Sequence, residues 1–154
     1  MRPKVLSLSS IGIVRNAVTD PKQRGWAAVA SDLVLEERYA EALDGIEDYS
    51  HVMVIFWLDQ AKAPKSMKDH VQGRKELPVV GFFARRAPTR PNPIAVTSVP
   101  LVSRNGHILR VRGLDAIDGT PLLDVKPYTP AFDQVDGAQV PGWNRLIYED
   151  EDYF

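Results

Sequence analysis

Apolar residues in this chain come in short runs, separated by polar turns that contain glycine, proline or asparagine. The strongest run, residues 50–58, is rich in β-branched and aromatic residues and shows no polar alternation, which predicts a strand buried on both faces. Asn105-Gly106, the strongest short signal for a β-hairpin, separates two further runs. The pattern predicts six or seven strands, at 5–14, 32–38, 50–58, 77–84, 94–103, 107–112 and 121–128.

Helical signals are few. Residues 39–43 predict a short helical turn that Asp44-Gly45 ends, and 143–148 predict another turn. Residues 59–73 are polar and basic without a clear period, which indicates a mobile loop or a short helix. Many strands and no alternation with helices favour a mainly β fold, a small barrel or a sandwich with short helical additions. No repeat or linker divides the sequence, so we expect one domain across 1–154.

Composition is that of an ordinary globular protein, with 154 residues, 44% hydrophobic and 25% charged. The absence of cysteine excludes disulfides, thiolate metal sites and a cysteine nucleophile. We see no apolar segment of membrane-spanning length, and expect a cytoplasmic protein. The net charge of -1 conceals an asymmetry. Residues 65–90 hold seven basic and two acidic side chains and could steer a polyanion, whereas 149–152 are all acidic and are expected to be a solvated end.

The most distinctive stretch is 81–94, where an apolar run leads into three arginines and three prolines. Each proline fixes its own φ and favours extended conformations for the residue before it, so Arg90 and Asn92 are expected to be held extended. Planar side chains with several donors on a rigid loop suit a site that grips an anion or a planar ligand. The alternative is an exposed proline-rich turn with solvated arginines. The residues concerned are Arg85, Arg86, Arg90, Pro88, Pro91 and Pro93.

Asp124, Lys126 and Tyr128 form a second candidate group in the last predicted strand. Residues at i and i+2 share one face of a strand, so the three side chains are expected to lie together if the strand continues to Tyr128. A carboxylate, an ammonium and a phenol could orient a substrate and manage a proton. A salt-bridged surface patch is the alternative, since exposed pairs are common.

Other candidates are isolated. Trp26, at the exit of the polar loop 15–25, packs on the core or lines a ligand site. His51 opens the most apolar strand, either as part of a capped strand end or at the edge of a site. The acidic turn Asp115 to Asp118 is an Asx turn, or accepts hydrogen bonds from hydroxyl or amine donors of a ligand.

Standard metal and nucleotide signatures are missing. The three histidines lie at no metal-ligand spacing, so we expect no metal site; they are His51, His70 and His107. Neither a glycine-rich dinucleotide loop nor a P-loop is present.

Four blocks carry a family likeness: Gly81-Phe-Phe-Ala-Arg-Arg-Ala-Pro-Thr-Arg-Pro-Asn-Pro-Ile94, with shorter blocks at 11–15, 45–51 and 114–128. In this order they resemble the TsaA-like family, whose characterised members are TrmO-type tRNA methyltransferases. The blocks span roughly residues 11–130. Arg85 stands where the family usually has a small polar residue, and Ala95 stands at a common glycine.

The resemblance implies a small β-barrel that binds S-adenosylmethionine and works as a homodimer, with the cofactor near the subunit interface. In TrmO-type members the methyl group goes to N6 of threonylcarbamoyladenosine beside the anticodon of a tRNA. Two alternatives stay open: methylation of a small molecule, and a module that binds S-adenosylmethionine without turnover.

The resemblance also implies site residues. Four segments would hold the cofactor, through Gly25, Trp26, His51, Arg86, Arg90, Asn92, Leu114, Asp115, Ile117 and Asp118. The catalytic wall would consist of Asp124, Lys126 and Tyr128. For in-line displacement at the methyl sulfonium, the protein has mainly to align the acceptor nitrogen with the methyl group. We expect Asp124 and Tyr128 to handle the proton, and Lys126 or an arginine to hold a carboxylate of the acceptor.

Overall fold

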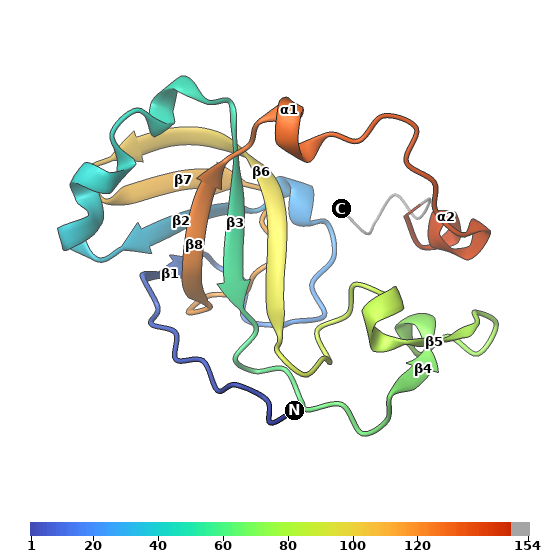
Figure 1. Ribbon diagram of the computed structural model, residues 1–154. Coiled ribbons are helices and arrows are strands. Elements are labelled where there is room, and N and C mark those ends of the chain that lie inside the picture. The colour runs from blue at the N-terminus through green and yellow to red at the C-terminus, as the bar shows by residue number, and fades with distance from the viewer. Residues whose placement is uncertain (149–154) are drawn as a thin grey trace.

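The computed structural model describes residues 1–148, and its main body is a closed barrel of six antiparallel strands (Figure 1). Around the barrel the order is β1-β2-β7-β6-β3-β8, and β8 closes on β1. This architecture confirms the mainly β class and the barrel. The strands are β1 (Gly12–Arg15), β2 (Ala30–Leu35), β3 (His51–Trp57), β6 (Ile94–Asn105), β7 (Ile108–Arg112) and β8 (Pro121–Pro127).

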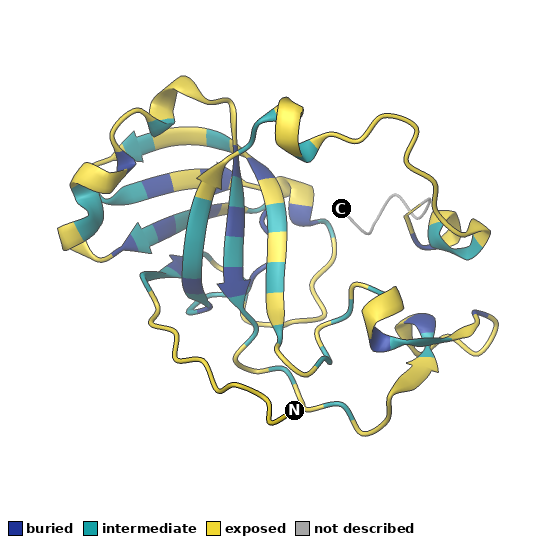
Figure 2. Cartoon of the chain, in the orientation of Figure 1, coloured by how far each residue is buried: buried dark blue, intermediate teal, exposed yellow. Residues whose placement is uncertain are grey.

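The core lies inside the barrel and is formed by every second residue of the strands (Figure 2). On β3, Val52, Val54 and Phe56 are buried, whereas Met53 and Ile55 between them are only half-buried. The prediction that both faces of this strand are buried is therefore wrong. The reason is that a barrel strand turns only one face to the interior, while the other faces outward.

Tight backbone geometry explains the glycines at positions 12 and 106. A Cβ added at Gly12 would collide with the backbone carbonyl of Val34, so the close approach of β1 to β2 requires glycine there. Gly106 has φ 60° in the turn between β6 and β7, which confirms the hairpin predicted at Asn105-Gly106.

Two predicted strands differ from the structure. The segment 5–14 enters the sheet only at Gly12, and Val5, Leu6 and Leu8 are exposed, because β1 pairs with its neighbours only through 12–15. The segment 77–84 contains a short strand, β5 (Val79–Gly81), and this strand lies outside the barrel. It pairs with β4 (Lys68–His70), which falls in the region 59–73 predicted to be a loop or a short helix.

The two-stranded sheet belongs to a small unit that stands beside the barrel (Figure 1). We call this unit the appendage; it comprises residues 65–90 and the helix α2 (Gly142–Tyr148). Its own apolar cluster joins Val71, Leu77 and Ile147, with Val80 and Trp143 packed against them. The helix predicted at 143–148 is thus present, and it attaches the end of the described chain to the appendage.

The remaining helices are short. The predicted turn at 39–43 is the 3-10 helix η2 (Glu37–Leu43). The others are η1 (Trp26–Ala28), η3 (Ile46–Asp48), η4 (Val71–Gly73), η5 (Phe82–Ala84) and α1 (Pro130–Asp133). None of the helices within residues 1–148 is long and apolar enough to cross a membrane. The acidic segment predicted to be a solvated end, 149–152, lies outside the described residues.

Candidate functional site

One edge of β6 brings two candidate segments together. Residues 94–100 pair with β3 on one side, whereas on the other side β7 pairs only with residues from Leu101 onward. Arg86 donates from Nη2 to the carbonyl oxygen of Val96 at 2.7 Å. The next residue, Thr97, donates from Oγ1 to Oδ1 of Asp115 at 2.6 Å. We call the segment 85–93, between η5 and β6, the arginine loop. This loop and the acidic turn, far apart in the sequence, therefore meet at adjacent positions of one strand.

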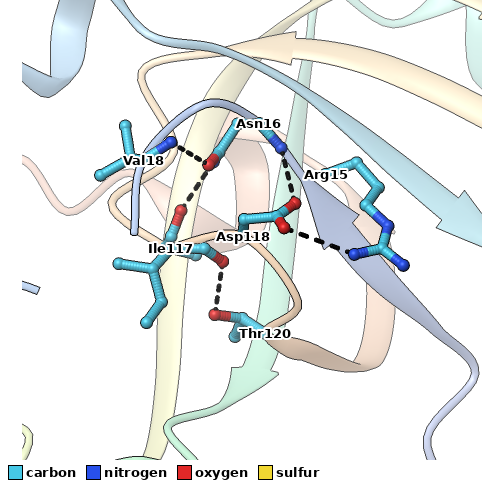
Figure 3. A network of polar contacts seen from close by, with 7 residues as sticks. Arg15, Asn16, Val18, Ile117, Asp118 and Thr120 are labelled. Carbon is cyan, nitrogen blue, oxygen red and sulfur yellow. Dashed lines mark hydrogen bonds and ion pairs between the residues drawn. The ribbon is translucent and has the colours of Figure 1, made fainter. Parts of the chain in front are cut away.

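Asn16 fixes the acidic turn to the loop that follows β1 (Figure 3). Its Nδ2 donates to the carbonyl oxygen of Ala116 at 2.8 Å and to Oγ of the buried Ser31 at 2.9 Å. Its Oδ1 accepts a hydrogen bond from the backbone N–H of Val18 at 2.9 Å. Sequence analysis missed this residue. The signal for it was an asparagine at a strand end that can bond the N–H two residues on.

Asp118 is engaged within the protein. Its carboxylate accepts a hydrogen bond from the backbone N–H of Asn16 at 3.1 Å and forms an ion pair with Arg15 at 3.4 Å (Figure 3). Thr120 Oγ1 donates to the carbonyl oxygen of Ile117 at 2.7 Å and tightens the same turn. These contacts give Asp118 a role in holding the turn. Asp115 is the more exposed carboxylate of the turn.

Leu114 and the pair Gly25-Trp26 stand beside that turn. Leu114 is fully buried in the barrel core, so its main chain is the part of it that a ligand could meet. Gly25 adopts a left-handed conformation with φ 69° directly before η1, whose first residue, Trp26, is buried. Gly113, which precedes the turn, donates its N–H to the carbonyl oxygen of Val29 at 2.8 Å. This hydrogen bond ties the turn to the end of η1.

The arginine loop is braced by its own side chains. Arg90 donates from Nη1 to the carbonyl oxygens of Arg85 and Ala87, each at 3.1 Å. Arg85 donates from Nη1 to the carbonyl oxygen of His70 at 2.9 Å, which ties the loop to the appendage. Asn92 is exposed, and its carbonyl oxygen accepts from the N–H of Ile94 at 2.7 Å. Of the three arginines, Arg86 is the one that reaches β6, while Arg90 stabilises the loop.

The predicted catalytic group lies on the outer surface of β8 and β3. Lys126 and Asp124 form an ion pair of 2.7 Å, and hydrogen bonding to Asp124 raises the pKa of Lys126 above its ordinary value. The ring centroids of His51 and Tyr128 lie 6.3 Å apart, and the N–H of Tyr128 donates to the carbonyl oxygen of His51 at 3.1 Å. Ser50 Oγ lies 2.8 Å from Nδ1 of His51. His51 therefore lies with the β8 group and apart from the arginine loop.

Two separate clusters result. One contains Arg86 and Asp115 at the edge of β6, and the other contains Asp124, Lys126 and Tyr128 along β8. In the sheet, β3 lies between β6 and β8. Neighbouring strands are roughly 4.8 Å apart, so the two clusters are separated by on the order of 10 Å around the barrel. No group of three or more histidine or acidic side chains within residues 1–148 could hold a metal ion.

The protein is thus a small closed barrel of antiparallel strands, with an arginine loop and an acidic turn at one strand edge. The family model of the tRNA-methyltransferase O N-terminal domain matches residues 12–134. The chain therefore belongs to this family.

Similar proteins agree with this membership. A Pyrococcus abyssi protein named as a probable S-adenosyl-L-methionine-binding protein is 38% identical over 147 residues, which cover 92% of this chain and 77% of that protein. The Escherichia coli tRNA (adenine(37)-N6)-methyltransferase is 30% identical over 83% of this chain and 60% of its own length. A crystal structure of TrmO from Pseudomonas aeruginosa superposes with a TM-score of 0.74 at 33% identity, over 88% of this chain and 61% of that one. The chain thus spans about three fifths of the solved TrmO chain.

Proposed function

We propose that this protein is a cytoplasmic, S-adenosylmethionine-dependent methyltransferase that methylates N6 of threonylcarbamoyladenosine beside the anticodon of a tRNA. Family membership and the names of the relatives support the cofactor and the class of acceptor. The observation that carries the proposal is the meeting of Arg86 and Asp115 on adjacent residues of β6.

The chemistry of this edge fits the cofactor. S-adenosylmethionine carries a carboxylate, an ammonium group and ribose hydroxyls. The Arg86 guanidinium would bind the carboxylate, because such pairs are charge-assisted and often bidentate. Asp115 would accept hydrogen bonds from hydroxyl or ammonium donors, and the main chain at Leu114 and Ile117 would line the same site. Gly25 and Trp26 would close it on the side of η1, and Asn92 would border it from the arginine loop.

The catalytic group acts on the acceptor. The bound cofactor supplies a methyl group on a sulfonium, which needs no further activation. The protein therefore has to align N6 of the adenosine and take up its proton. Asp124 would accept the proton as the N6–methyl bond forms. Lys126, whose raised pKa keeps it an ammonium, would hold the carboxylate of the threonylcarbamoyl group. Tyr128 and His51 would position the base.

A homodimer would complete the site. Within one chain the proposed cofactor residues and catalytic residues are separated by β3. Between the two clusters, the outer barrel surface shows half-buried Met53 and Ile55 and the exposed apolar residues Ile94 and Val96. Covering this surface with a second copy would bury it and place the catalytic group of one protomer near the cofactor edge of the other.

Transfer from methyl-labelled S-adenosylmethionine to bulk tRNA tests the proposal. We expect label in tRNA, at an adenosine that carries threonylcarbamoyl. Cofactor binding without transfer to any RNA would reject the tRNA assignment. Several relatives are named only as binding proteins, so this outcome would favour a module without turnover, unless label appeared in a small molecule.

A further inference from the structure

A cavity of about 410 Å³ lies in the appendage, between the arginine loop and α2. The loop contributes Arg85, Arg86 and Arg90 to its wall, and α2 contributes Trp143 and Tyr148 among others. Trp143 and Tyr148 fall outside residues 12–134, which the family model matches. This volume is within the range of cavities that take a ligand of nucleotide size.

The charge of this cavity is not compensated within the described chain. Among residues 1–148, the contacts of the three arginines are to backbone carbonyl oxygens, and no carboxylate forms an ion pair with any of them. In addition, the buried Nε of Arg85 has no hydrogen-bond partner there. A buried donor without a partner is costly, and three guanidinium groups around one cavity favour an anion.

The aromatic side of the cavity narrows the class of anion. Trp143 packs against the appendage cluster of Val71, Leu77 and Ile147, which fixes its indole, and it also lines the cavity. An arginine-rich wall opposite a fixed aromatic ring is the arrangement by which proteins take single-stranded nucleic acid, with a base stacked on the ring and the phosphate on the cations.

From these observations, we propose that the cavity is a subsite for one nucleotide of an RNA strand, with its base on Trp143 and its phosphate on Arg85. The subsite rests on the proposed function, since it assumes an RNA acceptor, and it adds a place where the strand is held outside the reaction centre. Exposed basic residues continue along the appendage, at Lys65, Lys68 and Lys75, where further phosphates of the strand could bind.

Charge argues against the cofactor as the occupant. S-adenosylmethionine carries a net positive charge, because its sulfonium and ammonium outweigh its carboxylate. The described lining of the cavity contains no acidic side chain to pair with the sulfonium or the ammonium group, whereas the edge of β6 offers Asp115. The nucleotide group itself could belong to an RNA strand or to a free mononucleotide, and the experiment below separates the two.

Tryptophan fluorescence reports on the cavity independently of turnover. We would titrate the wild-type protein with an RNA hairpin that has a single-stranded loop, with adenosine monophosphate, and with S-adenosylmethionine. The hairpin is expected to quench emission, and the quench should be absent in Trp143→Phe, which removes the indole and keeps a ring for stacking. Trp143→Leu should weaken hairpin binding about tenfold, because the stacking surface is lost, while Trp143→Phe should retain most of the affinity.

A pair of charge variants tests the phosphate contact. Arg85→Met should weaken hairpin binding. It should also make the slope of log affinity against log salt concentration shallower by about 0.7, because one phosphate contact with a single strand contributes that much. Arg145→Met removes one charge from an exposed position of α2 that does not line the cavity, and should leave that slope unchanged. Leu146→Ala, also exposed on α2, is the matched control for Trp143→Leu, and thermal unfolding confirms that each variant is folded.

The outcomes are distinct. Quenching by the hairpin that depends on Trp143 and Arg85 supports the subsite. Quenching by S-adenosylmethionine in its place would overturn it and assign the cavity to the cofactor. Tighter binding of adenosine monophosphate than of the hairpin would overturn it in favour of a free nucleotide. Hairpin affinity unchanged in folded Trp143→Leu and Arg85→Met, in a protein that still methylates tRNA, would reject the subsite and leave the proposed function intact.

Discussion

Asn16 joins three parts of the chain through one side chain. It binds the acidic turn at Ala116, the buried hydroxyl of Ser31 on β2, and the N–H of Val18 in its own loop. Each of these bonds satisfies a polar group that is partly or wholly removed from water, where an unmade bond is costly. The position of Asp115 at the edge of β6 thus depends on a residue that need not touch the cofactor.

Asn16→Ala is expected to lower the free energy of unfolding by about 2 kcal/mol, because Ser31 and the carbonyl of Ala116 lose their partner. Affinity for S-adenosylmethionine should also fall at a temperature where the variant is folded. Urea unfolding and cofactor titration measure the two effects. Gln23→Ala, which removes an exposed contact to the next residue, should change neither. An Asn16→Ala variant as stable as the wild type would show that the hydrogen bonds of Asn16 do not hold the acidic turn.

Arg86 and Arg90 are expected to act differently. Arg86→Ala should weaken S-adenosylmethionine binding at least tenfold, since a hydrogen bond to a charged group contributes roughly 1.5–3 kcal/mol. It should cost less stability than Arg90→Ala, because its one bond, to the carbonyl oxygen of Val96, is exposed to water. Arg90→Ala should weaken binding through a looser loop, and should also cost about 1 kcal/mol of stability, because two bonds to loop carbonyls are lost. Calorimetric titration with thermal unfolding separates the two. Unchanged affinity in both variants would move the site elsewhere.

At the scale of elements, the barrel strands are held by cross-strand pairs as well as by the core. Asp32 on β2 lies opposite Arg110 on β7 and accepts hydrogen bonds of 2.8 and 3.0 Å from its guanidinium. Hydrogen bonding to Arg110, together with its charge, lowers the pKa of Asp32 below the ordinary value of 3.8. A lowered pKa in the folded state means that the pair stabilises the protein above the unfolded pKa and that this contribution is lost as the pH falls through the folded one.

Asp32→Asn should therefore destabilise the protein at neutral pH and make no difference at a pH below the folded pKa of Asp32. Urea unfolding of both proteins between neutral pH and about pH 3, near the ordinary pKa of an aspartate, would follow the difference. Between these limits the difference in free energy of unfolding between the two proteins should narrow as the pH falls. A gap that stays constant or widens toward acid would show that Asp32 is not stabilised as a carboxylate.

The sequence allowed elements to be predicted where the signal is local. The Asn105-Gly106 turn and the strands on either side of it depend on neighbouring residues, and the structure confirms both. The segment 77–84 shows the limit: its apolar run indicates a strand, but whether that strand joins the barrel or pairs with β4 depends on distant partners. The apolar residues at 5–8 indicate a strand as well, yet no neighbour pairs with them among the described residues.

In the candidate site, too, local features could be predicted from the sequence and distant contacts could not. That Asp124 and Lys126 share a face followed from their spacing, and the structure pairs them. That Arg86 meets β6 while Arg90 braces its own loop could not be read from the sequence, because both are arginines in one short stretch. The resemblance places His51 with the cofactor residues, and the structure adds that its ring lies beside that of Tyr128, a neighbour that the sequence does not indicate.

At the scale of the whole molecule, the separation of the two clusters makes assembly part of the proposed mechanism. Ile94→Asp places a charge on the exposed apolar surface between them, and should convert a dimer into monomers with loss of methyl transfer. Val102→Asp makes the same change on β6, near the hairpin, and should leave the dimer intact. Sedimentation of the three proteins measures the outcome. A wild-type protein that transfers methyl groups as a monomer would reject the dimeric site.

Binding of S-adenosylmethionine tests the central claim most directly, because the cofactor edge, the dimer and the reaction all depend on it. At about a hundred times its dissociation constant, the cofactor should stabilise the wild-type protein by roughly 2.7 kcal/mol. This increase should appear as a higher unfolding temperature, and it should be strongly reduced in Arg86→Ala. An unfolding temperature that does not change at any cofactor concentration would contradict the account.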